Sequence, residues 1–295
     1  MNILVGQVET LKRVFSQEDF NRFAVLSGDD NPIHVDPAFS ARTTFGKTVA
    51  HGMLLYGVVC TVLGTRLPGP GTVQLEQELM FPTPTYVDEE VTVQVEVTAV
   101  QPEKALAELA TVITRPGGEV GLQGRTLVCW PGGRPASNFG AGLPPLGSTE
   151  HVTETLYKNL RVGQRDWSSR VFTAAELAEY ADLTGDTNPV FTDTAYAIDI
   201  GFNGPAVPGS LIGGMFSYLL GTQLPGRGTN YLKQRLVFLA PIYPGEKIKA
   251  EVEIIRLRPE KELVNLRTLC TTPTGKVVCA GEALVLVRDL QVASR

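Results

Sequence analysis

The fold is decided by residues 21–64, NRFAVLSGDDNPIHVDPAFSARTTFGKTVAHGMLLYGVVCTVLG. The stretch begins with a polar, turn-rich loop that contains Asp29 and His34, and it ends with a segment that is apolar on nearly every side. A helix without a polar face must be enclosed by other structure. A carboxylate and an imidazole five residues apart, on a loop fixed by Pro32 beside such a helix, predict a functional site at a buried wall.

The same pattern occurs twice in the chain. Gly28 and Asp29 recur as Gly185 and Asp186, and every further match lies at the same distance along the chain, without gaps. A constant offset over most of each half indicates a tandem duplication. The other matched positions include Asn31 with Asn188, Pro32 with Pro189, Phe81 with Phe238 and Pro84 with Pro241.

After each apolar helix the hydrophobic period changes to two, which is typical of strands with one buried face. Short loops at 116–118 and 273–275 join consecutive runs and predict antiparallel hairpins. An antiparallel sheet with one face in water, wrapped around one apolar helix, satisfies both patterns. We therefore predict an α+β fold, with apolar helices over 52–65 and 209–222 and strands over 72–81, 91–100, 105–114, 119–130, 229–239, 247–257, 263–272 and 277–288.

The repeat divides the chain into two domains. We assign 1–130 to an N-terminal unit with the intact motif, 131–157 to a linker rich in Pro, Gly and Ser, and 158–295 to a C-terminal unit with a degenerate motif. We expect the two units to pair as a pseudo-dimer within the chain, with their apolar helices side by side, because edge-to-edge pairing covers exposed strand edges. Further homo-oligomerisation is left open.

Composition excludes several classes of protein. The 295 residues carry a net charge of -5 and show no stripe of Lys and Arg, so we expect no nucleic-acid partner. The longest apolar stretch, 53–63, is too short to span a bilayer, and the N-terminus does not resemble a signal peptide. The four cysteines lack metal spacing and predict buried thiols in a reducing cytoplasm. His151, beside the linker, is expected at the surface.

The loop and the start of the apolar helix resemble the hydratase motif of the MaoC-like dehydratases, a family that includes the (R)-specific enoyl-CoA hydratases. The resemblance covers essentially the whole chain and implies two hotdog units in tandem, each an antiparallel sheet around a central helix. It also implies reversible addition of water to a trans-2-enoyl-CoA or carrier-protein thioester, with no metal and no cofactor. The matching residues are Ser27 to His34, Asp36, Phe45 and Ala50-His51-Gly52.

The resemblance assigns proton transfer to Asp29 and His34, and stabilisation of the thioester oxygen to the backbone N–H of Gly52. The physics of a helix start agrees, because its first N–H groups are unpaired and carry the positive end of the helix dipole. Taken singly, Asp29 would be a turn residue and His34 a loop histidine; the complete motif favours the functional interpretation. We expect supporting roles for Asn31, which recurs in the second half, and for His51.

The second half departs from the motif. Phe191 stands at the position of His34, and Pro208 stands at that of His51. We therefore predict one active site, in the N-terminal half, with the C-terminal half acting as a packing and specificity partner. Because the degenerate half is not constrained by catalysis, the wall that it contributes to the active site could vary and admit a bulkier acyl group.

Two other functions remain open from the sequence. The chain could be a non-catalytic accessory subunit that binds acyl thioesters, or a thioesterase on the same fold. Asp29 and His34 argue against a vestigial site. Loss of the ultraviolet absorbance of crotonyl-CoA would indicate hydration, whereas release of a free thiol would indicate a thioesterase.

Overall fold

The computed structural model describes residues 3–130 and 156–290. The predicted linker spans 131–157, and its residues 131–155, which include His151, lie outside the described residues, so the domain boundaries stay a prediction. Among the described residues, no helix is long and apolar enough to cross a membrane.

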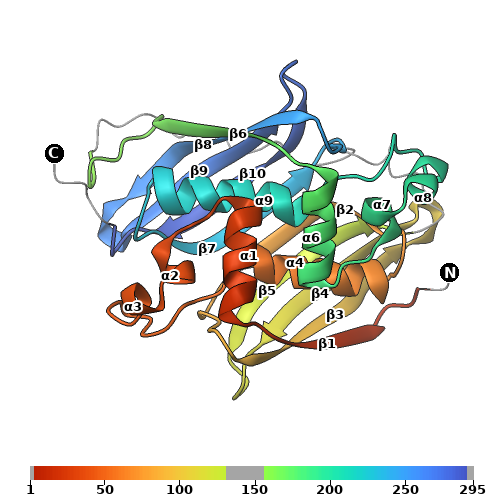
Figure 1. Ribbon diagram of the computed structural model, residues 1–295, viewed down its shortest axis with the longest axis horizontal. Helices are drawn as coiled ribbons and strands as arrows, with labels where there is room; N and C mark the ends of the chain where they lie inside the picture. The colour runs from red at the N-terminus through yellow and green to blue at the C-terminus, as the bar shows by residue number, and fades with distance from the viewer. Residues whose placement is uncertain (1–2, 131–155, 291–295) are drawn as a thin grey trace.

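One antiparallel sheet of ten strands runs through both halves and curves around the helices (Figure 1). The strand order is β1-β3-β4-β5-β2-β7-β10-β9-β8-β6, so each half contributes five strands and β2 meets β7 at the centre. The strands are β1 (Val8–Val14), β2 (Val73–Met80), β3 (Glu90–Gln101), β4 (Leu106–Thr114), β5 (Val120–Cys129), β6 (Arg165–Val171), β7 (Asn230–Phe238), β8 (Lys247–Arg258), β9 (Leu263–Thr271) and β10 (Val277–Leu286).

Two apolar helices, α4 and α9, contact each other on the concave face of the sheet (Figure 1). In α4 every residue from Met53 to Gly64 is buried, as expected for a helix without a polar face. The helices are α1 (Gln17–Ser27), α2 (Pro32–Val35), α3 (Pro37–Ser40), α4 (Gly52–Thr65), α6 (Ala174–Thr184), α7 (Pro189–Thr192), α8 (Thr194–Asp199) and α9 (Gly209–Tyr218), with short 3-10 turns at Pro102–Lys104 and Pro259–Lys261 and a π-helical turn at Leu219–Gln223.

The two halves form one folded body, which confirms the predicted pseudo-dimer. Strands β2 and β7 pair antiparallel, and Glu76 on β2 forms an ion pair of 2.7 Å with Arg235 on β7. Arg22 on α1 pairs with Glu179 and Asp182 on α6, each at 2.6 Å. Backbone and side-chain contacts therefore both join the two halves.

The predicted strands and hairpins are confirmed to within a few residues, whereas β1 and β6 were not predicted. Both are edge strands whose residues alternate between exposed and half-buried, so their apolar period is weak. The helix predicted over 209–222 is also wrong in its last turn, which is π-helical from Leu219. The four cysteines are buried and form no disulfide with one another, as predicted.

Candidate active site

The loop after α1 owes its shape to local backbone rules. The helix ends at Gly28, whose left-handed φ of 81° suits glycine and whose N–H donates to the carbonyl of Ala24 at 2.8 Å. Asn31 then caps the one-turn helix α2, which begins with Pro32. These two turns reverse the chain and bring the Asp29 and His34 side chains to the same place, near the start of α4.

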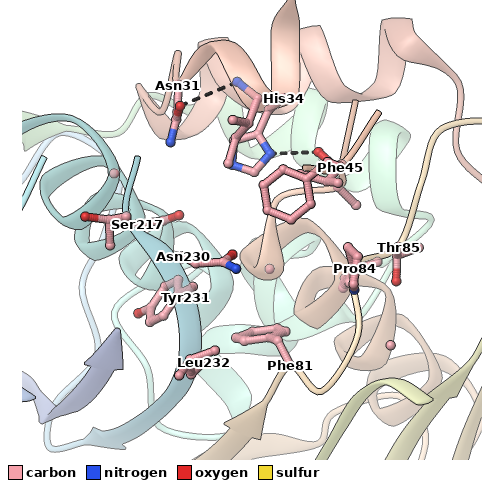
Figure 2. Close-up of a pocket in the computed structure, with 18 of the residues that line it drawn as sticks. Asn31, His34, Phe45, Phe81, Pro84, Thr85, Ser217, Asn230, Tyr231 and Leu232 are labelled. Atoms are coloured by element: carbon pink, nitrogen blue, oxygen red, sulfur yellow. Dashed lines mark hydrogen bonds between the residues drawn. The ribbon is translucent and has the colours of Figure 1, made fainter. Parts of the chain in front are cut away.

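A cavity of about 130 Å³ lies where the loop, α4 and the C-terminal half meet (Figure 2). The predicted residues Asp29, Asn31, His34 and Gly52 all line it, together with Phe45. The N-terminal half also contributes Leu55 on α4 and the segment 81–85, and the C-terminal half contributes residues of α9, of the turn that follows it and of β7. The lining residues from that half include Ser217, Leu220, Gly221, Asn230, Tyr231 and Leu232.

Asp29 is buried and held by hydrogen bonds from both halves. Its Oδ2 accepts a bond of 2.6 Å from the hydroxyl of Ser217, and its Oδ1 accepts one of 3.3 Å from the N–H of Asn31. A short bond to a carboxylate is stronger than one between neutral groups and fixes the orientation of the acid. The sequence-based prediction did not include Ser217. The repeat does carry a signal for it, because the matching residue of the first half is Cys60, so the two halves differ at this position.

His34 presents a free ring nitrogen to the cavity. Its Nδ1 donates to the carbonyl of Val49 at 2.7 Å, which leaves the lone pair on Nε2. Burial lowers the pKa of His34, and the nearby carboxylate of Asp29 opposes this only in part. The neutral imidazole can therefore accept a proton.

His51 does not line the cavity but supports both residues of the pair. Its Nε2 donates to the backbone carbonyl of Asp29 at 2.9 Å, and its ring stacks on that of His34 with centroids 3.9 Å apart. Burial holds the pKa of His51 well below its usual value, and the neighbouring His34 lowers it further. A neutral His51 adds no charge beside the pair.

Gly52 is the first residue of α4, so its N–H has no acceptor within the helix. The ring of Phe81 packs on the glycine: a Cβ at this position would lie 2.7 Å from Phe81 Cζ. The equivalent Gly209 is in the same situation, because its Cβ would lie 2.4 Å from Phe238 Cζ. Packing alone thus requires a glycine in both halves, whatever the N–H does.

Asp29, His34 and His51 are also the one group of possible metal ligands among the described residues, with one ligand atom from each lying within 4.8 Å of the others. The lone pair of an imidazole nitrogen lies in the ring plane, and the planes of these two rings are stacked at 28°. Their lone pairs therefore do not converge on one point. The geometry favours an acid–base pair, since a water can bridge two groups at this separation with hydrogen bonds of about 2.8 Å.

The C-terminal half has a counterpart of this cavity that is smaller, about 40 Å³, and mostly apolar. Phe191 occupies the position of His34, and Asp186, the counterpart of Asp29, does not line it. Within 3–130 and 156–290 the Oδ2 of Asp186 has no hydrogen-bond partner, and burial raises the pKa of Asp186 to about 7. The apolar replacements are Phe191 for His34, Val73 for Asn230, Ala240 for Thr83 and Ile242 for Thr85.

A continuous antiparallel sheet around two central helices, with a buried Asp–His pair at the start of one of them, defines a double hotdog protein. Both halves match the family model described as MaoC like domain, over residues 5–115 and 161–272, so the chain belongs to the MaoC-like family. The expected fold and family are thereby confirmed.

Among its relatives is the (R)-specific enoyl-CoA hydratase of Aeromonas caviae, 43% identical over 127 residues, which are 43% of this chain and 95% of the relative. The 3-hydroxybutyryl-CoA dehydratase of Methylorubrum extorquens is 46% identical over 124 residues, 42% of this chain and 78% of the relative. A solved structure described as a MaoC-like dehydratase superimposes with a TM-score of 0.76 at 18% identity, over 96% of this chain and 98% of the other. A Mycobacterium tuberculosis protein described as having a double hotdog fold matches with a TM-score of 0.72 at 16% identity, over 96% of each chain.

Proposed function

We propose that the protein adds water reversibly to a trans-2-enoyl thioester and forms the (R)-3-hydroxyacyl thioester. The observation that carries this proposal is the Asp29–His34 pair, which faces a cavity at the start of an apolar helix. The pair suits proton transfer to and from one water, and the helix start suits a developing negative charge.

In the proposed mechanism a water lies between the carboxylate of Asp29 and the Nε2 of His34. As the water oxygen bonds to Cβ, the pair takes one proton from it, and the electrons of the C=C bond move toward the thioester oxygen. The N–H of Gly52 donates to that oxygen, and the proton held by the pair is then delivered to Cα. Protons and electrons balance without a redox change, so we propose that no cofactor is needed.

The other polar groups have supporting roles in this scheme. Ser217 orients the Asp29 carboxylate through its 2.6 Å hydrogen bond, and His51 holds the backbone of the same residue. Asn31 and Asn188 both shape their loops by capping the short helix that follows. Asn188 also contacts the other half, because it donates to the carbonyl of Thr72 and accepts from the N–H of Gly71. No such bond to the other half is present for Asn31 among the described residues, so its side-chain NH2 group can face the substrate while its Oδ1 caps α2.

The experiment follows the absorbance of crotonyl-CoA, whose conjugated enoyl group is lost on hydration. Asp29→Asn and His34→Ala should each lower the turnover rate by about 10² to 10⁴ fold, the usual contribution of a positioned acid or base. Asp186→Ala, at the equivalent position of the second half, is the matched control and should keep the rate near that of the wild type. Near wild-type turnover in a folded Asp29 or His34 variant would overturn the mechanism.

The same assay separates the two alternatives. A thioesterase would release free CoA thiol from crotonyl-CoA, and an accessory subunit would bind the thioester without changing its absorbance. Each carboxylate oxygen of Asp29 accepts one hydrogen bond, including the bond from Ser217, which supports a competent site rather than a vestigial one.

A further inference from the structure

We propose that Tyr231, on β7 of the C-terminal half, closes the acyl end of the cavity and restricts the substrate to short acyl chains. This inference rests on the proposed function and adds the substrate class. Figure 2 shows Tyr231 and Phe81 on the side of the cavity opposite Asn31 and His34. The proposal places the acyl chain between the Asp–His pair and these two rings.

The Tyr231 side chain is held by a hydrogen bond of its hydroxyl and by packing of its ring. Its hydroxyl donates to the Oε1 of Gln234, and the amide of Gln234 in turn donates to the hydroxyl of Thr268 at 3.1 Å. Its ring packs on Phe81 with centroids 5.7 Å apart. Gln234 is buried, so moving the tyrosine away would leave a buried polar group unpaired. The wall is rigid for that reason.

The volume of the cavity fits a small acyl group. A cavity of about 150 Å³ accommodates benzene, which has six carbon atoms. The cavity here, about 130 Å³, must hold the thioester carbonyl and the reacting water as well as the acyl carbons. Leu55 on α4 and Leu220 on the turn after α9 complete the wall, and both are almost fully buried in the core.

Among the described residues, the counterpart cavity of the C-terminal half is too small to hold the end of a longer chain. This cavity, about 40 Å³, is lined by Phe191, Phe202 and Phe238. At the position that matches Tyr231, the first half has Gln74, which lines this smaller cavity. The proposal therefore replaces our expectation that the degenerate half admits a bulkier acyl group. The side chain at this position sets the length limit of the one competent site.

The experiment measures kcat/KM for crotonyl-, hexenoyl-, octenoyl- and decenoyl-CoA. In the wild type kcat/KM should fall by about tenfold or more between crotonyl- and octenoyl-CoA, because a rigid apolar pocket penalises excess methylenes by at least that factor. Tyr231→Ala should raise the octenoyl-to-crotonyl ratio by about tenfold or more. Tyr231→Phe keeps the ring and its packing on Phe81, so its ratio should stay well below that of Tyr231→Ala.

A second variant and a binding measurement guard against loss of folding or activity. Tyr231→Gln introduces the residue of the matching position and should also raise the ratio. Calorimetry with saturated butyryl-CoA and octanoyl-CoA on the wild type should show about tenfold tighter binding of the shorter chain. Equal kcat/KM or equal binding across chain lengths, or an unchanged ratio in both folded variants, would overturn the proposal. Binding that favours butyryl-CoA without turnover of any enoyl-CoA would support this inference while refuting the proposed hydratase activity.

Discussion

At the scale of single residues, the two halves place the same acid in opposite surroundings. Asp29 receives a hydroxyl and an N–H, one on each oxygen. In the part of the chain that the structure describes, Asp186 receives only the N–H of Asn188, at 3.2 Å, and its second oxygen has no partner. The position of the missing hydroxyl is occupied by Cys60, whose thiol donates instead to Gln74 at 3.2 Å. One change of side chain thus leaves Asp186 a buried acid without a function in the proposed mechanism.

This difference predicts how stability depends on pH. Burial raises the pKa of Asp186 from 3.8 to about 7, so the folded state binds this proton more tightly than the unfolded state. The stability that the neutral form supplies is fully present below pH 4 and is lost as pH rises toward 7. Asp186→Asn should therefore raise the free energy of unfolding at pH 8, by up to about 4 kcal/mol, and change it little at pH 4.

Urea unfolding at the two pH values checks this prediction. Asp29→Asn serves as the control, since it removes an acid that already has two donors and should not stabilise the protein at pH 8. An equal effect of Asp186→Asn at both pH values would show that Asp186 does not titrate in this range.

The sequence alone could predict that Asp29 and His34 line the same cavity, because both lie on one short loop. The turns of that loop are determined by Gly28, Asn31 and Pro32. The sequence could not predict Ser217 and Tyr231, which reach the same cavity from more than 180 residues away. Only the pairing of β2 with β7 and the contact of α4 with α9 bring them there.

At the scale of elements, comparing the starts of α4 and α9 distinguishes the packing role of a glycine from its proposed catalytic role. Gly52 and Gly209 are each covered by a phenylalanine ring, but only Gly52 lies beside the Asp–His pair. Gly52→Ala and Gly209→Ala should both destabilise the protein by about 1 to 3 kcal/mol, because the rings of Phe81 and Phe238 must shift. Only Gly52→Ala should also lower turnover of crotonyl-CoA beyond the fraction of protein that is unfolded.

Thermal unfolding and steady-state kinetics of the two variants test the expectation. The paired design is informative because overpacking is common to both glycines. A similar loss of turnover in folded Gly209→Ala would mean that the rate reports on packing of the central helices and not on the N–H of Gly52.

The ends of the central helices mark a limit of sequence analysis. Leu63-Gly64-Thr65 and Leu220-Gly221-Thr222 are the same tripeptide at matching positions. The first belongs to a regular α-helix, whereas the second belongs to the π-helical turn Leu219–Gln223. Identical local propensities cannot distinguish them, so the surroundings decide. The π-turn borders the candidate active site, since Leu220 and Gly221 line its cavity, and π-helical turns are frequent at functional sites.

At the scale of the whole molecule, the proposed function assigns catalysis to the cavity with Asp29 and His34 and none to its smaller, apolar counterpart. Restoring a histidine with Phe191→His should not create a second active site. Asp186 lacks a hydroxyl donor, Pro208 replaces the supporting His51, and Val73 and Ile242 make the cavity apolar. Acid–base groups act only when their supports hold them to within about half an ångström.

The measurement is made in an Asp29→Asn background, where the first site is silent. Turnover of crotonyl-CoA by Asp29→Asn/Phe191→His should stay at the level of Asp29→Asn alone. Recovery of even a few per cent of wild-type turnover would show that the second cavity needs only its histidine, and that its other residues are of little consequence.

The pairing of β2 with β7 within a single chain has a consequence for evolution. In a symmetric homodimer one codon specifies the same residue in both sites, so any substitution that helps one role is imposed on the other. Here the loop with Asp29 and the wall with Ser217 and Tyr231 are encoded by separate copies. Position 60 can hold a thiol while position 217 keeps its hydroxyl. Mutation can therefore alter the wall of β7 and α9, and with it the range of substrates, while the reacting loop is inherited unchanged.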